Sequence, residues 1–464
     1  MQMSQPILGQ QPVTTSPPPD DSPVPVSPSV PNADFELDHS WALTQTGMLL
    51  QQLTITLKHD AIEPSTLAND WRTQLAPIDP DYGITFNGRT PIWLHLAIHC
   101  QLPEVPLYAS YDPRYGGSII TRCADPEFMP GQILSVQPSH HPDPTALAPA
   151  IAIVGPPDSG KSVFSHALRR ALLDRGQSVL LQRANWDGEG NFIHELPDGC
   201  DPEIFKAEHK RGMSDRFFGH HADDIQALRH NQDFVLVDFG GMIQPEKQPL
   251  LDVCTHYIIV SSNPEKTADW HNFCQRAGLQ PIAELSTVLD TIETRHSDDP
   301  YLRYTSGYWK IGQAPPIPQT LLQRLLVLEH TQIPSSIGNT DRASMSTTTS
   351  ANHPSQIELQ LIPHTTRDGL AYQHLRICLT SQDGLVEPSD IIGLRLPSEL
   401  NPTQGVVLEG RAPIWVYAYL VHECHATAWV GCFDPRQQGA IVVETHTRQT
   451  QVGAVLLIDL PTTS

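Results

Sequence analysis

The chain of 464 residues is too long for one ordinary hydrophobic core, so we expect two to four domains. Its 51 Asp and Glu residues against 29 Lys and Arg give a net charge of −22, which argues against binding of long DNA or RNA. A small phosphorylated ligand stays compatible with this charge, because a few Arg side chains and backbone N–H groups can hold one.

The sequence shows no secretory leader and no run of apolar residues long enough to cross a membrane, so no membrane partner is expected. Its eight cysteines are scattered without a C-x-x-C pair, which is typical of reduced thiols. These features predict a cytoplasmic protein.

Three segments of biased composition divide the chain. Residues 1–35 hold nine of the 43 prolines and are predicted to form a disordered tail. A Pro/His-rich stretch begins at residue 138, and the Ser/Thr-rich residues 331–355 are typical of a linker. The predicted folded parts are therefore 36–137, 138–330 and 356–464.

The first and last folded parts are copies of one module. Residues 84–114 read ITFNGRTPIWLHLAIHCQLPEVPLYASYDPR, and residues 406–436 read VVLEGRAPIWVYAYLVHECHATAWVGCFDPR. Both contain G-R-x-P-I-W and reach D-P-R after the same spacing. An ordered set of matches at one offset indicates an internal duplication.

The C-terminal copy has the pattern of a small α/β fold. Strands are predicted at 357–361, 374–379 and 406–410, a helix at 413–425, and strands at 428–433 and 440–446. Pro413 suits the first turn of the helix, where a missing N–H costs nothing. Strand–helix–strand connectivity implies a parallel pair, and the short turn before 440–446 implies an antiparallel return.

The central part opens with a phosphate-binding motif. Its strand, glycine loop and amphipathic helix fit G-x-x-x-x-G-K-S and predict a P-loop domain with a mostly parallel sheet. Lys161 would reach the β- and γ-phosphates of ATP, and Ser162 and Asp238, at the end of a second strand, would hold Mg²⁺. The predicted ATP-binding residues are Gly155, Ser159, Gly160, Lys161, Ser162 and Asp238.

The subtype of this P-loop domain stays open at the level of sequence. Asp238 is followed by Phe239 rather than by the Glu that AAA-type ATPases use to activate water. Asn263 is either a sensor-type residue or an ordinary loop residue. ATP hydrolysis and kinase-like phosphoryl transfer are both compatible with the motif.

The repeated module resembles a known family. G-R-x-P-I-W, a helix with H-x-x-H, D-P-R and then G-A-[IV]-V-V-x-x-H resemble the small CRISPR-associated ring nucleases of the Csx-three type, over 356–464 and, more loosely, 40–137. The resemblance implies CARF-like modules that cleave cyclic tetra-adenylate, a messenger of type III CRISPR antiviral defence. It also implies manganese-stimulated cleavage and a homo-oligomer around the ring. Fusion to a P-loop domain resembles larger members called AAA fusions.

The family's functional residues map onto the C-terminal copy. His425 matches the catalytic histidine, Asp434 and Arg436 match D-P-R, and His446 matches a further family histidine. The resemblance thus implies His425, Asp434 and His446 as the catalytic residues. Gly410 and Arg411 match the turn before the helix. His425 is suited to proton transfer, whereas ligation of Mn²⁺ is the rival role for the same side chain.

Topology separates two groups within these residues. Gly410, Arg411, Asp434 and Arg436 follow parallel strands and should share the carboxyl edge of the sheet, where α/β folds bind ligands. His425 and His446 should lie at the opposite edge. We therefore expect a composite site, with the ring bound by one module and the histidine supplied by another module stacked on it.

The N-terminal copy keeps the ligand edge and lacks the histidines. Its predicted ligand residues are Gly88, Arg89, Asp112 and Arg114. Pro103 and Ala124 stand at the positions of His425 and His446, and the nearby His95 and His99 are out of register. This copy is expected to bind the ring without cleaving it.

The leading hypothesis is a ring nuclease that is coupled to, or regulated by, an ATP-binding domain. One alternative is a sensor in which cyclic oligoadenylate controls an ATPase or kinase. The other is a nucleotide kinase that the flanking modules only assemble.

Overall fold

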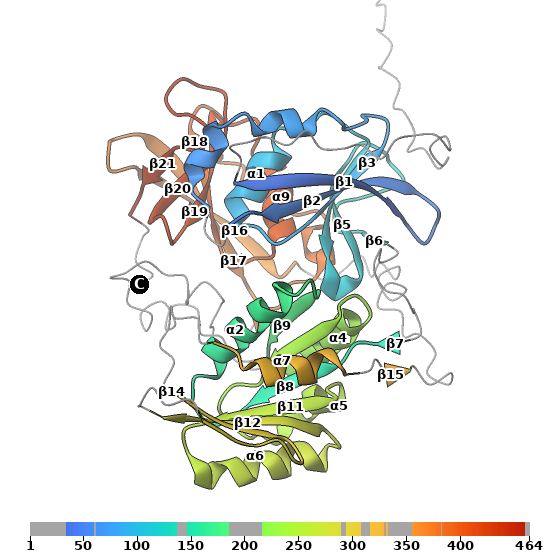
Figure 1. The fold of residues 1–464 in the computed structure, drawn as a ribbon. Helices are drawn as coiled ribbons and strands as arrows, with labels where there is room; N and C mark the ends of the chain where they lie inside the picture. The colour runs from blue at the N-terminus through green and yellow to red at the C-terminus, as the bar shows by residue number, and fades with distance from the viewer. Residues whose placement is uncertain are drawn as a thin grey trace, which may run out of the picture. The chain divides into compact units, whose positions relative to one another are not determined.

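The computed structural model describes residues 34–59, 62–136, 146–184, 216–288, 294–307, 316–328, 331–332, 355–381 and 383–459. The tail predicted for 1–35 lies outside these residues except for Asp34 and Phe35, and so does the predicted linker 331–355 except for 331–332 and 355. The chain divides into two compact units. One contains both copies of the repeated module, and the other contains residues 140–340 and the short turn Pro113–Gly116 (Figure 1).

The C-terminal copy is a six-stranded sheet with one long helix. Its strands, in spatial order, are β16 (Ile357–Thr365), β17 (Ala371–Leu379), β18 (Gly405–Gly410), β19 (Trp429–Asp434), β20 (Gly439–Thr445) and β21 (Val455–Leu457). Helix α9 (Ile414–Glu423) joins the parallel strands β18 and β19, and β20 returns antiparallel to β19, as predicted. The helix was predicted to end at residue 425, whereas α9 ends at Glu423.

The N-terminal copy repeats this order. Its strands are β1 (Phe35–Leu43), β2 (Leu49–Leu57), β3 (Gly83–Asn87), β4 (Leu107–Asp112), β5 (Gly117–Cys123) and β6 (Ile133–Ser135), and α1 (Ile92–His99) follows β3. Each copy also has a 3-10 turn that begins at a proline, η1 (Pro64–Ala68) in one and η6 (Pro388–Ile391) in the other. A second 3-10 turn, η2 (Trp71–Leu75), adds the buried Trp71 to the core.

The glycine of each G-R-x-P-I-W motif is required by the backbone. Gly88 and Gly410 have φ values of +116° and +143°, which side-chain-bearing residues rarely adopt. A Cβ atom at either position would lie 2.3 or 2.4 Å from the carbonyl oxygen of the neighbouring strand, at Ile55 or Ile377. These glycines shape the turn that leads from strand to helix.

The two copies pack against each other with pseudo-twofold symmetry. Helix α1 contacts β19 and β20 of the other copy, and α9 contacts β4 and β5 in the same way. Gly131 of the first copy abuts the carbonyl of Pro388 at η6, and its counterpart Gly453 abuts the carbonyl of Pro64 at η1. Such reciprocal contacts are those of a symmetric dimer, here formed within one chain.

The second unit is a seven-stranded, mostly parallel sheet, which confirms the predicted α/β class. Its spatial order is β13 (Thr294–Ser297), β14 (Leu302–Gly307), β12 (Gln280–Val288), β11 (His256–Ser261), β8 (Ala150–Val154), β10 (Phe234–Asp238) and β9 (Val179–Arg183), and only β13 runs antiparallel to its neighbour. A further small pair joins β7 (Ala146–Leu147) and β15 (Thr331–Gln332).

Helices cover both faces of this sheet. They are α2 (Lys161–Leu173), α4 (Phe217–Arg229), α5 (Gln248–Asp252), α6 (Pro264–Arg276) and α7 (Gln319–Leu326). One hydrophobic cluster contains residues of α4, α5 and α6, and a second contains residues of α2 and α7, with sheet residues in both. Among the described residues, no helix is long and apolar enough to span a membrane.

Candidate functional sites

The structure brings His425 and His446 together with Glu444. The His425 Nδ1 atom lies 2.7 Å from Glu444 Oε1, and His446 Nε2 lies 3.7 Å from the same oxygen. The two rings meet edge to face with centroids 4.9 Å apart, and His446 Nε2 also hydrogen bonds to the carbonyl of His425 at 3.0 Å. His425 follows α9, whereas Glu444 and His446 lie two residues apart at the end of β20, which places them on one side of the strand.

This trio has the chemistry of a divalent-cation site. The three side chains offer ligand atoms that all lie within 4.8 Å of one another. Glu444 is buried, and its Oε2 atom has no nitrogen or oxygen partner among the described residues. An open hollow of about 410 Å³ adjoins the histidines and is lined by Pro402, His425, Ala426, Thr427, Ala428, His446 and Thr447. A buried carboxylate suits a cation, and imidazole and carboxylate are ligands for Mn²⁺ or Zn²⁺.

The N-terminal copy reaches this site through the end of α1. Cys100, the C-terminal cap residue of α1, interacts with Glu444, and burial together with that carboxylate raises the pKa of the thiol well above its usual value. His422 of α9 is half-buried, and burial, aided by Arg122 and His425, lowers its pKa to about 4. His422 is therefore neutral at pH 7.

The corresponding place in the N-terminal copy has different chemistry. Arg122 occupies the position of Glu444, and Pro103 and Ala124 occupy the positions of the two histidines. The Arg122 guanidinium pairs with Glu104 at 2.6 Å and lies 5.1 Å from the ring centre of Tyr108. A cationic side chain replaces the acidic one, so this place lacks the ligand set of the C-terminal copy.

His95 and His99 do not replace the missing histidines. Both are buried in α1, at 3% and 6% exposure. Burial lowers the pKa of His95 to about 4 and that of His99 to about 3. They are neutral core residues.

Asp434, which the family resemblance predicts to be catalytic together with the histidines, lies at the other end of β19. Thr445 pairs with Trp429 at one end of the strand and Gly439 with Asp434 at the other, a separation of roughly 17 Å. The Asp434 carboxylate accepts hydrogen bonds from Arg436 Nε at 3.0 Å and Nη2 at 2.7 Å. Asp434 thus orients Arg436 and does not touch His425 or His446.

The predicted ligand edges of the two copies adjoin. Gly410 and the exposed Arg411 directly precede α9. The indole N–H of Trp415, in the first turn of α9, donates to Asp112 Oδ2 at 3.3 Å, so the end of β4 lies beside the start of α9. His425 lies past the far end of the same helix, which is about 15 Å long.

The remaining ligand residues of the N-terminal copy occupy turns. Gly88 and Arg89 are exposed in the turn after β3. Arg114 lies in the 3-10 turn η3 (Pro113–Tyr115) after β4, with its guanidinium 5.9 Å from the ring centre of Tyr115.

The P-loop residues have the geometry of a phosphate cradle. Position 155 requires glycine for two reasons. Its φ is +147°, and a Cβ atom there would lie 1.9 Å from the carbonyl oxygen of Val260. Gly160 caps the N-terminus of α2, and Lys161 Nζ donates to the Pro156 carbonyl at 2.6 Å and to Ser159 Oγ at 3.4 Å. The loop therefore already surrounds the lysine amine.

The two predicted metal-shell residues of the P-loop domain touch. The Ser162 hydroxyl donates to Asp238 Oδ2 at 2.9 Å, because the strands β8 and β10 are direct neighbours in the sheet. This pair is the arrangement that would share one Mg²⁺.

Asn263 is a helix cap in this structure. Its side chain accepts hydrogen bonds from the backbone N–H groups of Glu265 and Lys266, at the start of α6. The ordinary structural role, one of the two alternatives, therefore explains this residue.

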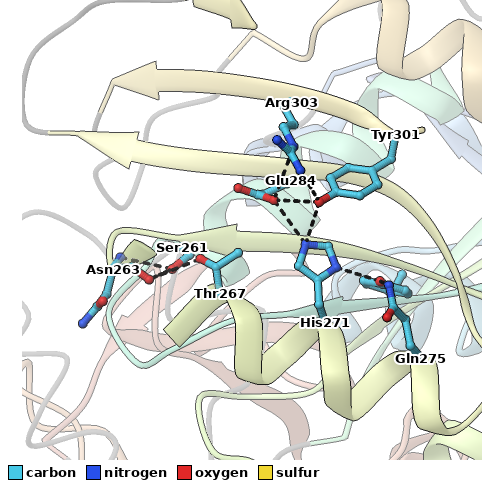
Figure 2. Close-up of polar contacts among 9 residues, drawn as sticks. Ser261, Asn263, Thr267, His271, Gln275, Glu284, Tyr301 and Arg303 are labelled. Carbon is cyan, nitrogen blue, oxygen red and sulfur yellow. Dashed lines mark hydrogen bonds and ion pairs between the residues drawn. The ribbon is translucent and has the colours of Figure 1, made fainter. Parts of the chain in front are cut away.

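A polar network ties α6 to the sheet. His271 Nε2 lies 3.1 Å from Glu284 Oε2 and 3.2 Å from Tyr301 OH, as Figure 2 shows. Arg303 donates to Tyr301 OH at 3.0 Å. The hydrogen bond from His271 is the main cause that lowers the pKa of Glu284. These side chains satisfy one another's hydrogen-bonding groups, which fits a structural role.

Sequence reasoning missed Glu444. It lies in the apolar run AIVVETH, two residues before His446, and period-two alternation already places both side chains on one face. Cys100 gave no such signal, because its contact with Glu444 depends on the packing of the two copies.

Comparisons with known proteins agree with the duplication. A family described as CRISPR-associated protein (Cas_csx3) matches twice, at residues 55–135 and 379–457. An uncharacterized protein of Aquifex aeolicus (strain VF5) is 49% identical over 51 residues, which is 11% of this chain and 46% of that protein. The match thus spans less than half of that curated relative. Both copies are similar to one CRISPR-associated family, as the resemblance predicted.

Two solved structures match parts of this chain at low sequence identity and low TM-score. The septum site-determining protein MinD of Pyrococcus horikoshii OT3, complexed with Mg-ADP, is 19% identical with a TM-score of 0.24, over 30% of this chain and 70% of that one. A plasmid partition protein of Borrelia burgdorferi B31 bound to AMPPNP is 15% identical with a TM-score of 0.26, over 39% of this chain and 98% of that one.

Proposed function

We propose that this protein is a cytoplasmic ring nuclease that cleaves cyclic tetra-adenylate at the His425 site of its C-terminal copy. The observation that carries this proposal is the His425–Glu444–His446 trio, in a module that matches a CRISPR-associated family. The N-terminal copy lacks all three side chains, so a single cleavage site per chain is proposed.

The chemistry needs one proton-transfer group beside a correctly placed ribose. In cleavage, the ribose 2′-oxygen bonds to phosphorus, the bond from phosphorus to the 5′-oxygen breaks, and the 2′-proton passes to a base. With Nδ1 protonated, His425 donates to Glu444 and keeps Nε2 as that base. Glu444 fixes the tautomer and orientation of the ring and stabilises the imidazolium, which can then protonate the leaving oxygen.

A Mn²⁺ ion fits the same residues. In this rival role His425, Glu444 and His446 would hold the ion, and His425 would be a ligand instead of the base. Among the described residues, Glu444 Oε2 has no nitrogen or oxygen partner. When bound, such an ion supplies positive charge that stabilises a phosphoryl group.

The ring itself is proposed to bind at the adjoining carboxyl edges of the two copies. Arg411 and Arg436 in one copy, and Arg89 and Arg114 in the other, supply the positive charge for phosphates. Because His425 lies past the far end of α9, a ring bound there cannot reach it within one chain. We therefore propose that a second chain, stacked on the edge, completes the site in a homo-oligomer.

The central domain is proposed to bind ATP with Mg²⁺. Lys161 would contact the β- and γ-phosphates, and the Ser162–Asp238 pair would hold the metal. Hydrolysis of ATP is part of this proposal and would couple the domain to ring cleavage or regulate it.

The alternative is a sensor whose modules bind cyclic oligoadenylate and control the P-loop domain. Labelled cyclic tetra-adenylate incubated with wild type, His425→Ala and Lys161→Ala, with and without Mn²⁺ and ATP, separates the two. Cleavage lost in His425→Ala supports the nuclease. An uncut ring that changes the rate of ATP hydrolysis by the wild type supports the sensor.

A further inference from the structure

Lys247 is an almost fully buried lysine beside the strand that carries Asp238. Only 1% of it is exposed, although lysine is rarely buried without a specific set of acceptors. Its Nζ donates to the carbonyls of Phe239 at 2.6 Å and Met242 at 2.8 Å. These two carbonyls flank Gly240 and Gly241, so the lysine holds the loop that directly follows Asp238.

The same loop also contacts the phosphate-binding loop. A Cβ atom on Gly241 would lie 2.7 Å from the Cα atom of Pro157, in the P-loop. Gly240, with a φ of +69°, makes the bend that allows this approach. The loop 239–242 is thus fixed by two contacts, one with Lys247 and one with Pro157.

The loop 239–242 acts directly on Asp238. The Gly240 N–H donates to Asp238 Oδ1 at 3.1 Å, and the other carboxylate oxygen accepts from Ser162. If the loop moved, the carboxylate would lose the donor that fixes its orientation toward Ser162. Mutation of a residue that orients a metal-binding carboxylate typically lowers metal affinity or activity about 10- to 100-fold.

We infer that Lys247 is a positioning residue for the Mg²⁺ shell of the P-loop domain, acting through the loop 239–242 on Asp238. This inference rests on the proposed binding of Mg·ATP. Because Lys247 Nζ donates to the loop 239–242, it should affect nucleotide affinity only when the metal is present.

The test is the Mg²⁺ dependence of nucleotide affinity in the full chain. Binding of a fluorescent ATP analogue is measured with Mg²⁺ and with EDTA, for wild type, Lys247→Met and, as a matched control, the exposed Lys266→Met. Met fills similar space without donating a hydrogen bond. We expect Lys247→Met to keep its affinity in EDTA and to lose about 10-fold or more of the tightening by Mg²⁺. Lys266→Met should behave as wild type.

A purely structural role would weaken binding equally in both conditions. Wild-type Mg²⁺ tightening in Lys247→Met, or equal weakening with Mg²⁺ and EDTA, overturns the inference and leaves the nucleotide proposal intact. Absence of binding by the wild type overturns both. Should Lys247→Met fail to fold, Gly241→Ala displaces the loop from Pro157 with Lys247 in place. It should show the same selective loss, and unchanged Mg²⁺ tightening in that variant overturns the inference.

Discussion

His425 and Glu444 are 19 residues apart in the sequence, yet His425 Nδ1 lies 2.7 Å from Glu444 Oε1. The contact joins the end of α9 to the end of β20, beside the edge where β19 begins. It sets which nitrogen of His425 faces the hollow, because the Nδ1 atom is engaged by the carboxylate.

Replacing Glu444 with Gln keeps the size of the side chain and removes its charge. Ring cleavage should fall about 10- to 100-fold, because His425 loses the partner that orients it, whereas ring binding should be retained. Single-turnover cleavage and a separate binding titration measure the two effects. The exposed Glu399→Gln is the control, and a wild-type cleavage rate in Glu444→Gln would exclude a role for the carboxylate.

Asp434→Ala tests whether this residue positions Arg436 or takes part in the reaction. Its carboxylate is bound to Arg436 and lies far from His425, so the variant should weaken ring binding about as much as Arg436→Ala does. The double variant should add little, because the two side chains act as one unit. Normal ring affinity with abolished single-turnover cleavage in Asp434→Ala would show that Asp434 takes part in the reaction.

Gly410→Ala should destabilise the unit that contains the two copies by more than about 1 kcal/mol. The new Cβ atom would lie 2.4 Å from the Ile377 carbonyl oxygen, at a φ that alanine rarely adopts. Urea unfolding measures the loss. Gly219→Ala in α4, where a Cβ atom has open space, is the control and should cause no loss. Equal midpoints for Gly410→Ala and wild type would contradict the assigned turn geometry.

The buried His99 should make the unit that contains the two copies less stable in acid. Burial, with smaller contributions from His95, His422 and Arg122, lowers its pKa to about 3, so it is neutral when folded and takes up a proton near pH 6.5 when unfolded. Its contribution to stability is present above pH 6.5 and is lost as the pH falls toward 3.

His99→Leu should therefore flatten the decline of the unfolding free energy between pH 6.5 and 4, by up to about 1.4 kcal/mol per pH unit. Urea unfolding at several pH values measures this slope. The exposed His59→Leu should leave the slope unchanged, and a His99→Leu slope equal to that of the wild type would show that His99 is not the acid-sensitive group.

Strong local patterns explain what the sequence predicted well. The alternating strands and the proline-led helix α9 gave the elements of the C-terminal copy, and the glycine loop gave the P-loop of the central domain. Glu444 was missed because its spacing shows only that it shares a face with His446, and the fold alone brings His425 of the helix end to that face. Asp434 was grouped with the histidines by motif, although the length of β19 separates them.

The association of the two copies was beyond sequence reasoning. Gly131 and Gly453 are ordinary turn glycines by sequence, and only packing shows that each fits against a proline carbonyl of the other copy. The contact between Cys100 and Glu444 follows from the same packing. Long-range pairing of this kind leaves no periodic trace in the chain.

The most direct test of the central claim is cleavage of labelled cyclic tetra-adenylate, with Mn²⁺, by wild type and by His425→Ala at equal concentrations. The account predicts linear products with wild type, at a rate per chain that falls on dilution as chains separate, and uncut ring that is still bound with His425→Ala. Equal cleavage by both proteins, or no cleavage by wild type at any concentration, would contradict it.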